Sequence, residues 1–266
     1  MQKFFGKLGI GITRFSELKR LQFLENNQAQ YDMGFLLNFE QNTAGKLVQL
    51  LPISESQLRQ DLFVLCATGF KRKGFFVEFG AADGRHLSNS YLLEKNFGWT
   101  GILAEPARIW HKKIVQNRPE TTLEKNCVWS ESGVTLQFKE TINAELSTIE
   151  EYAASDEHKD SRANALEYQV KTISLNDLLE KYGAPSRPDY LSIDTEGSEF
   201  QILKELDFSK YKFTVITCEH NYSKERQNIY NLLSSNGYVR VLESISDFDD
   251  WYVLGSELKH LQELIK

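Results

Sequence analysis

The sequence has few cysteines, no long apolar run and no excess of basic residues. Its three cysteines, Cys66, Cys127 and Cys218, lie far apart and form no CxxC pair. This spacing argues against a disulfide framework and against a structural zinc site. No apolar run approaches the roughly 20 residues that a membrane-spanning helix needs. The 31 basic and 37 acidic side chains give a net charge of −6, whereas nucleic-acid binders normally carry a basic stripe. We therefore expect no nucleic-acid partner.

The remaining composition is typical of a globular protein. The 266 residues are 41% hydrophobic, which suffices for a sizeable core. At roughly 150 residues per domain, this length predicts one large domain or two small ones.

The first 24 residues are basic, with apolar positions at helix-like spacing. A signal peptide needs an unbroken apolar stretch, but Gly6, Lys7, Gly9 and Gly11 interrupt this one, so we expect a cytoplasmic protein. A helix packed on its own domain, or on a second copy of the chain in a homo-oligomer, fits better than a membrane-surface helix. We predict a helical extension over residues 1–53.

The next segment predicts a separate helix. Ser54 and Gln57 fit a capping box, and Gly69 stands where a C-terminal cap belongs. The apolar stripe between them comprises Leu58, Leu62, Leu65 and Cys66.

From residue 75 onward, short apolar runs alternate with helical stretches. This alternation predicts an α/β fold with a mostly parallel sheet covered on both faces. Strands are predicted at Phe75–Phe79, Gly101–Ala104, Thr122–Val128, Tyr190–Ile193, Phe213–Cys218, Val239–Leu242 and Trp251–Leu254. Helices are predicted at 88–97, 107–117, 174–182, 198–206 and 223–236.

Smaller signals mark helix ends and an insert. Ser174, Ser198 and Ser223 are predicted N-caps, and Gly183 and Gly237 fit the closing positions of helices. Val134–Phe138 and Val170–Ile173 predict extra strands around a polar insert at 141–167, which is either a lid or a solvated excursion.

In an open parallel sheet, ligands bind beyond the carboxyl ends of the strands. The first predicted strand ends in Glu78-Phe79-Gly80-Ala81-Ala82-Asp83-Gly84, whose small residues let the backbone approach a ligand closely. The second ends in Glu105-Pro106, 21 positions after Gly84, where an acid can accept hydrogen bonds from both ribose hydroxyls of an adenosine ligand. The third ends in Asn126-Cys127-Val128, which could flank an adenine ring or simply be buried.

The fourth and fifth strands end in acids. Asp194, Glu196 and Glu199 follow the fourth strand, and such acids repel one another unless a sulfonium, a metal ion or an amine lies among them. Glu219 and His220 follow the fifth strand, where a histidine could take a proton near neutral pH or could be structural.

With these motifs, the chain resembles the FkbM-type S-adenosylmethionine-dependent methyltransferases over roughly residues 54–254. The Asp-x-Glu-Gly-x-Glu string at 194–199 is the most specific part. Further matches are Glu78–Gly84, Ser88-Asn89-Ser90, Gly98-Trp99-Thr100-Gly101, Glu105-Pro106 and the upstream Ser56-Gln57-x-x-Gln60-Asp61.

The resemblance implies a Rossmann-like sheet of seven strands with the last one antiparallel, in a methyltransferase domain at 54–266. It also implies methyl transfer to a hydroxyl, most often of a sugar, a glycan or a secondary metabolite. The residues that it implies for cofactor binding are Glu78, Phe79, Gly80, Ala81, Asp83, Gly84, Asn89, Ser90, Glu105, Pro106, Asn126, Cys127, Val128 and Asp194.

A sugar hydroxyl is a poor nucleophile, so a base or a metal is expected. His220 is our candidate base, close to Asp194. Alternatively, Asp194 and Glu219 could hold Mg²⁺, which takes oxygen ligands and would lower the pKa of the hydroxyl. Catechol-type methyltransferases place metal ligands at the ends of the same two strands, and this chain is similar to them only in the chemistry of the residues at these positions.

Two other interpretations remain open. A nicotinamide-dependent oxidoreductase would share the glycine turn and the ribose acid, but the third glycine of its fingerprint is missing. An inactive binding or trafficking protein could retain the fold without turnover.

Overall fold

The computed structural model describes residues 27–141, 148–149 and 165–266. The predicted helix in the first 24 residues, and most of the 141–167 insert, lie outside these ranges. The main sheet contains β1 (Phe75–Phe79), β2 (Thr100–Ala104), β3 (Thr122–Glu124), β8 (Tyr190–Ile193), β9 (Val215–Glu219), β10 (Tyr238–Val241) and β11 (Asp249–Leu254).

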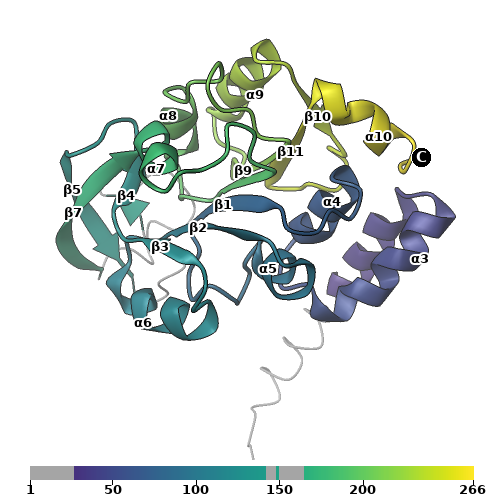
Figure 1. The fold of residues 1–266 in the computed structure, drawn as a ribbon, viewed down its shortest axis with the longest axis horizontal. Coiled ribbons are helices and arrows are strands. Elements are labelled where there is room, and N and C mark those ends of the chain that lie inside the picture. The colour runs from purple at the N-terminus through teal and green to yellow at the C-terminus, as the bar shows by residue number, and fades with distance from the viewer. Residues whose placement is uncertain (1–26, 142–147, 150–164) are drawn as a thin grey trace, which may run out of the picture.

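The seven strands lie in the order β10-β11-β9-β8-β1-β2-β3 (Figure 1). The pairs from β9 through β8, β1 and β2 to β3 are parallel. Strand β11 runs antiparallel to both of its neighbours, β9 and β10. The predicted α/β class, the seven strands and the antiparallel last strand are therefore confirmed.

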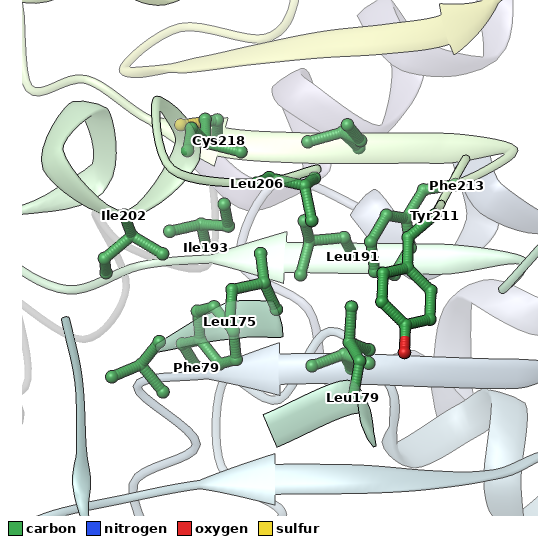
Figure 2. Close-up of a cluster of buried hydrophobic side chains, with 14 of the residues drawn as sticks. Phe79, Leu175, Leu179, Leu191, Ile193, Ile202, Leu206, Tyr211, Phe213 and Cys218 are labelled. Carbon is green, nitrogen blue, oxygen red and sulfur yellow. The ribbon is translucent and has the colours of Figure 1, made fainter. Parts of the chain in front are cut away.

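Helices cover both faces of this sheet (Figure 1). On one face lie α7 (Leu175–Lys181), α8 (Glu199–Leu203) and α9 (Arg226–Ser235). On the other lie α4 (Gln60–Ala67), α5 (Tyr91–Phe97), α6 (Arg108–Asn117) and α10 (Leu258–Gln262). Side chains alternate between these two cores, as the period of a strand requires: Phe79 packs with α7 and α8 (Figure 2), whereas Phe76 packs with α4 and α5.

A second sheet lies beside β3 at one end of the main sheet (Figure 1). It contains β4 (Cys127–Trp129), β5 (Thr135–Glu140), β6 (Thr148–Ile149) and β7 (Leu166–Ser174), in the order β4-β7-β5-β6. The predicted strand at 170–173 lies within β7, and the one predicted at 134–138 is confirmed from residue 135 onward as part of β5.

The prediction of one strand over Thr122–Val128 is wrong, because the chain leaves the main sheet after β3. The Glu124 carboxylate accepts hydrogen bonds from the backbone N–H of Lys125 and of Asn126, both at 2.8 Å. These bonds turn the chain, so that β4 pairs with β7 instead of continuing along β2.

The residues before β1 belong to the same core as the sheet. A helix at 27–37 and α3 (Gln41–Leu50) place Phe35, Phe39 and Leu47 in the cluster that contains Trp251. The ring centroids of Phe35 and Trp251 are 6.3 Å apart. The structure thus continues the core of the sheet into the predicted extension. No helix among the described residues is long and apolar enough to cross a membrane.

The predicted capping box at Ser54 and Gln57 is wrong. Helix α4 begins only at Gln60, after Arg59 adopts a left-handed backbone with φ +60°. Ser54 instead ends the 3₁₀ helix η1 (Leu51–Ile53), and its hydroxyl donates to the Asp61 carboxylate. The apolar positions assigned to this helix are buried, and Gly69 does follow the helix end with φ +64°.

Of the three predicted serine N-caps, only Ser174 makes a capping bond. Its side chain accepts a hydrogen bond from the backbone N–H of Asp177 at the start of α7. Ser198 occupies the N-cap of α8 without such a bond, and α9 begins after Glu225 rather than at Ser223. Gly183 and Gly237 have positive φ angles at helix ends, as predicted.

Ser174→Ala is expected to lower the free energy of unfolding by about 1 kcal/mol, because it leaves an N–H of the first turn of α7 without its acceptor. Ser223→Ala removes an exposed hydroxyl that caps no helix, so its effect should stay within about 0.5 kcal/mol. Urea unfolding of both variants measures the difference. Equal effects would contradict the assignment of the cap.

Candidate active site

A cavity opens at the carboxyl ends of β1, β2 and β8, where an open α/β sheet binds its ligands. The space between its walls, including the open mouth, is about 1000 Å³. The predicted contact residues that line it are Glu78, Phe79, Gly80, Asn89, Glu105, Pro106, Cys127, Val128 and Asp194. Further lining residues, which were not predicted as contacts, are Gln57, Gln60, Ala82, His86, Leu87, Ala104, Phe138, Ile149, Thr195, Glu196, Ser198 and Phe248.

The turn after β1 passes against the neighbouring strand end. Gly80 has φ +71°, and a Cβ atom there would lie 1.9 Å from the carbonyl oxygen of Asp194. Its N–H donates to the carbonyl of Ala104 at the end of β2. Glycine is therefore required at this position, and the turn is held between two strand ends.

Other predicted residues of this turn shape it from outside the cavity. The Asp83 carboxylate accepts hydrogen bonds from the backbone N–H of Arg85 and of His86. Gly84 has φ +79° beside the buried Arg118 side chain, and Ala81 is buried in the core. These residues hold the turn in place rather than face a ligand.

Glu78 anchors the segment that follows the turn. Its buried carboxylate accepts hydrogen bonds from the hydroxyls of Ser88 and Ser90 and, at 2.7 Å, from the N–H of Asn89. This network positions Asn89 at the cavity. The side-chain Oδ1 of Asn89 is buried without a hydrogen-bond partner among the described residues.

Arg118 supports the same segment and was not predicted. This buried guanidinium donates to the carbonyl of Gly84 and the hydroxyl of Ser90, and it pairs with Glu94. These partners lie 24 to 34 positions away in sequence. No local pattern therefore signals the role of Arg118.

Glu105 lies buried at the end of β2, facing the cavity. One carboxylate oxygen accepts from the N–H of Ala82 at 3.0 Å, and the other accepts from the N–H of Ala107 at 2.8 Å. It thus ties the glycine turn to its own strand end. Each oxygen keeps a second lone pair for a ligand. Burial raises the pKa of this carboxyl to about 8.

An apolar wall completes that side of the cavity. Cys127 and Val128 of β4 line it, as predicted, together with Phe138 and Ile149 of the second sheet. Asn126 does not line the cavity, because its backbone is held in the turn formed by Glu124.

Acidic residues at the ends of β8 and β9 lie on the side of the cavity opposite this apolar wall. Asp194 and Glu196 line the cavity, and carboxylate oxygens of Asp194, Glu196 and Glu219 all lie within 4.8 Å of one another. Burial and the charge of Asp249 raise the pKa of Asp194 to about 7. Burial and the charge of Asp194 raise the pKa of Glu219 well above its ordinary value.

The structure brings Asp194 and Glu219 together, whereas the His220 side chain lies beside Asp250 and not with these two acids. The buried His220 ring accepts a hydrogen bond from the N–H of Tyr222 at Nδ1, and its Nε2 lies 3.7 Å from Asp250. His220 is not among the residues that line the cavity. Burial lowers the pKa of the imidazole.

Comparison with known proteins identifies the family. A sequence profile described as the methyltransferase FkbM domain matches residues 78–254. The chain belongs to the methyltransferase FkbM family. This match and the seven-stranded sheet support an S-adenosylmethionine-dependent methyltransferase. No sequence among the curated proteins matches the chain significantly.

Three solved methyltransferases are similar to this FkbM chain. A precorrin-6y C5,15-methyltransferase of Geobacter metallireducens is 12% identical, with a TM-score of 0.39, over 73% of this chain and 86% of that one. A TehB-like methyltransferase of Corynebacterium glutamicum is 10% identical, with a TM-score of 0.36, over 80% and 94%. A methyltransferase of Aquifex aeolicus is 10% identical, with a TM-score of 0.35, over 79% and 97%.

The region before the FkbM match also contributes to the site. Gln57 and Gln60 line the cavity, and the Gln60 amide donates to the buried Asp249 carboxylate at 2.9 Å. The signal for both residues was the upstream Ser56-Gln57-x-x-Gln60-Asp61 string, although it did not show that they reach the cavity.

The raised pKa of the Glu105 carboxyl predicts that the stability of the protein depends on pH. Its pKa rises on folding from 4.5 to about 8, so the folded protein retains a proton that the unfolded chain releases between these values. This contribution to stability is complete below pH 4.5 and is lost as the pH rises through 8. Glu105→Gln should therefore gain about 2–4 kcal/mol relative to the unsubstituted protein between pH 5 and pH 9, since one pKa unit is about 1.4 kcal/mol.

Urea unfolding of the cofactor-free proteins at pH 5, 7 and 9 measures this difference. Other buried acids titrate in both proteins and cancel in the comparison. A difference between the two proteins that stays constant with pH would contradict the assignment to Glu105.

Proposed function

We propose that the chain transfers the methyl group of S-adenosylmethionine to a hydroxyl oxygen of a sugar or glycan. The observation that carries this proposal is the placement of Glu105, the Gly80 turn and Asp194 around one cavity. A carboxylate on each side of a close backbone turn suits a ligand that has ribose hydroxyls at one end and positive charge at the other.

In this arrangement, the two ribose hydroxyls donate to Glu105, which the structure already orients through Ala82 and Ala107. The adenine ring lies along the apolar wall formed by Cys127, Val128, Phe138 and Ile149. The ammonium group of the methionine end donates to the free Oδ1 of Asn89. The sulfonium then faces the acids at the end of β8.

The acceptor enters from the side of Gln57 and His86, two exposed residues at the rim of the cavity. Amide and imidazole groups both donate and accept hydrogen bonds, which suits a polyhydroxylated acceptor. A secondary metabolite with a hydroxyl group would present the same reacting atom. Transfer requires that oxygen to lie about 3 Å from the methyl carbon, in line with the bond to sulfur.

His220 remains our sequence-based candidate for the base, and one substitution tests it. A general base contributes about 10²–10⁴-fold to the rate, so His220→Gln would lower kcat by that factor with little change in KM for the cofactor. The position of the ring against Asp250 favours the opposite result, a loss of stability with kcat within about threefold. Initial rates and urea unfolding of this variant separate the two results.

The proposed function is tested with methyl-labelled S-adenosylmethionine and a panel of sugars, oligosaccharides, other alcohols and amines. We expect S-adenosylhomocysteine to form in step with a labelled methyl ether, located by mass spectrometry. Label found only on nitrogen or carbon would contradict transfer to a hydroxyl. Tight cofactor binding without transfer to any class of acceptor would instead favour the inactive binding protein.

A further inference from the structure

Three carboxylates from two adjacent strand ends converge beside the cavity. Asp194 follows β8, Glu196 lies two residues later, and Glu219 ends β9. Their oxygens lie within 4.8 Å of one another. Mg²⁺ binds oxygen ligands at roughly 2.0–2.1 Å and Ca²⁺ at roughly 2.3–2.6 Å, so two ligands of one ion are separated by at most about 4 Å for Mg²⁺ and about 5 Å for Ca²⁺. The three carboxylates therefore lie close enough for one ion to bind all of them after small side-chain movements.

A second observation, a buried carboxylate oxygen without a partner among the described residues, points to a ligand at this cluster. The side chain of Glu219 is buried, with the residue only 7% exposed, and its Oε2 has no hydrogen-bond partner among the described residues. An unpaired carboxylate oxygen that is removed from water is strongly destabilising. Such an atom beside two further carboxylates indicates a cation that the protein itself does not supply.

The distribution of basic side chains supports this interpretation. Asp250, on the neighbouring strand β11, pairs with both Arg226 and Arg240. Within the described ranges, no lysine or arginine forms an ion pair with Asp194 or Glu219, and the charges that act most strongly on these two groups are acidic. The fold thus pairs Asp250 with two arginines and leaves Asp194 and Glu219 without a basic partner among the residues that the structure describes.

The position of Glu219 favours a metal ion over an organic cation. Asp194 and Glu196 line the cavity, whereas Glu219 lies behind them. A substituted ammonium group or a sulfonium would have to bring its carbon substituents into that buried space. A bare divalent ion can lie between the three carboxylates and keep its remaining coordination positions on the cavity side.

We propose that Asp194, Glu196 and Glu219 bind a hard divalent cation such as Mg²⁺, with open coordination positions toward the acceptor. Its role in catalysis rests on the proposed function, whereas its binding does not. The acceptor hydroxyl coordinates the ion. The ion lowers the pKa of this hydroxyl, and the hydroxyl proton leaves to solvent. The oxygen then forms a bond to the methyl carbon while the bond from that carbon to sulfur breaks. The electron pair of this bond stays on sulfur, so that S-adenosylhomocysteine and a methyl ether result.

Cation binding is tested first on the full chain, stripped with a chelator and free of cofactor and acceptor. Titration calorimetry with MgCl₂ and electron paramagnetic resonance with MnCl₂ should both show one site. Glu219→Gln should weaken it at least tenfold, because one anionic ligand is lost. Glu205→Gln, which changes an exposed acid elsewhere, should leave the affinity unchanged.

Glu219→Gln is expected to remain folded, because it removes a buried like charge without changing the size of the side chain. In chelator its unfolding temperature should equal or exceed that of the unsubstituted protein, and Asp194→Asn provides a second variant with the same expectation of weakened binding. The proposed site would be overturned if the unsubstituted protein bound neither ion, or if both cluster variants bound the ions as tightly as the unsubstituted protein does.

The rate of methyl transfer then tests the role of the ion. Chelator should lower the rate at least tenfold, and Mg²⁺ should restore it, with cofactor affinity nearly unchanged. An unaltered rate in chelator would overturn activation by a metal while leaving the proposed methyl transfer intact.

Discussion

Gly80→Ala is expected to destabilise the protein by about 3 kcal/mol or more. The left-handed backbone at this position disfavours any side chain by about 1–2 kcal/mol. In addition, the new Cβ atom would lie 1.9 Å from the carbonyl oxygen of Asp194, which is a backbone atom and cannot rotate away. Relief requires β1 and β8 to separate at their carboxyl ends, and overpacking of this kind adds about 1–3 kcal/mol. Urea unfolding followed by circular dichroism measures the loss.

Gly98→Ala is the matched control. Gly98 has nearly the same φ, +69°, but nothing lies within 4 Å of the Cβ position. Only the backbone penalty of about 1–2 kcal/mol is then expected. If Gly80→Ala were no more destabilising than Gly98→Ala, the close contact between the turn and Asp194 would be disproved.

Glu105→Ala is expected to weaken S-adenosylmethionine binding about 10²–10³-fold. At pH 9, where the Glu105 carboxyl is ionised because its pKa is about 8, two hydrogen bonds from the ribose hydroxyls to a charged group would be lost, each worth about 1.5–3 kcal/mol. The N–H groups of Ala82 and Ala107 would also lose their acceptor, which loosens the glycine turn. Glu105→Gln keeps the shape of the side chain and one acceptor oxygen, so a smaller loss is expected.

Titration calorimetry on folded samples measures these affinities, with Glu120→Ala, an exposed acid outside the cavity, as the control. The control should bind as tightly as the unsubstituted protein. Affinities for Glu105→Ala within threefold of the control would show that Glu105 does not hold the ribose.

The central strands could be predicted from the sequence because they are buried on both faces. Phe75–Phe79 and Tyr190–Ile193 read as short apolar runs, and their observed bounds match the prediction. Thr122–Val128 read as one run too. Its division between two sheets depends on a single carboxylate, Glu124, which turns the backbone. Local hydrophobicity does not report such a bond.

The site likewise contains residues that the sequence could predict and residues that it could not. Residues that directly follow parallel strands, such as Glu105 and Asp194, could be placed at the cavity because the topology brings these strand ends together. Phe138 and Ile149 reach the cavity through the pairing of the second sheet, which has no local signal. The orientation of His220 toward Asp250 depends on packing across β9 and β11, which chain position does not specify.

The most direct test of the central claim is a calorimetric titration of the full, unsubstituted chain with S-adenosylmethionine and with S-adenosylhomocysteine. We predict that both bind at one shared site with micromolar affinity or better and compete with each other. A folded protein that binds neither ligand would contradict the assignment of this cavity to the methyl donor.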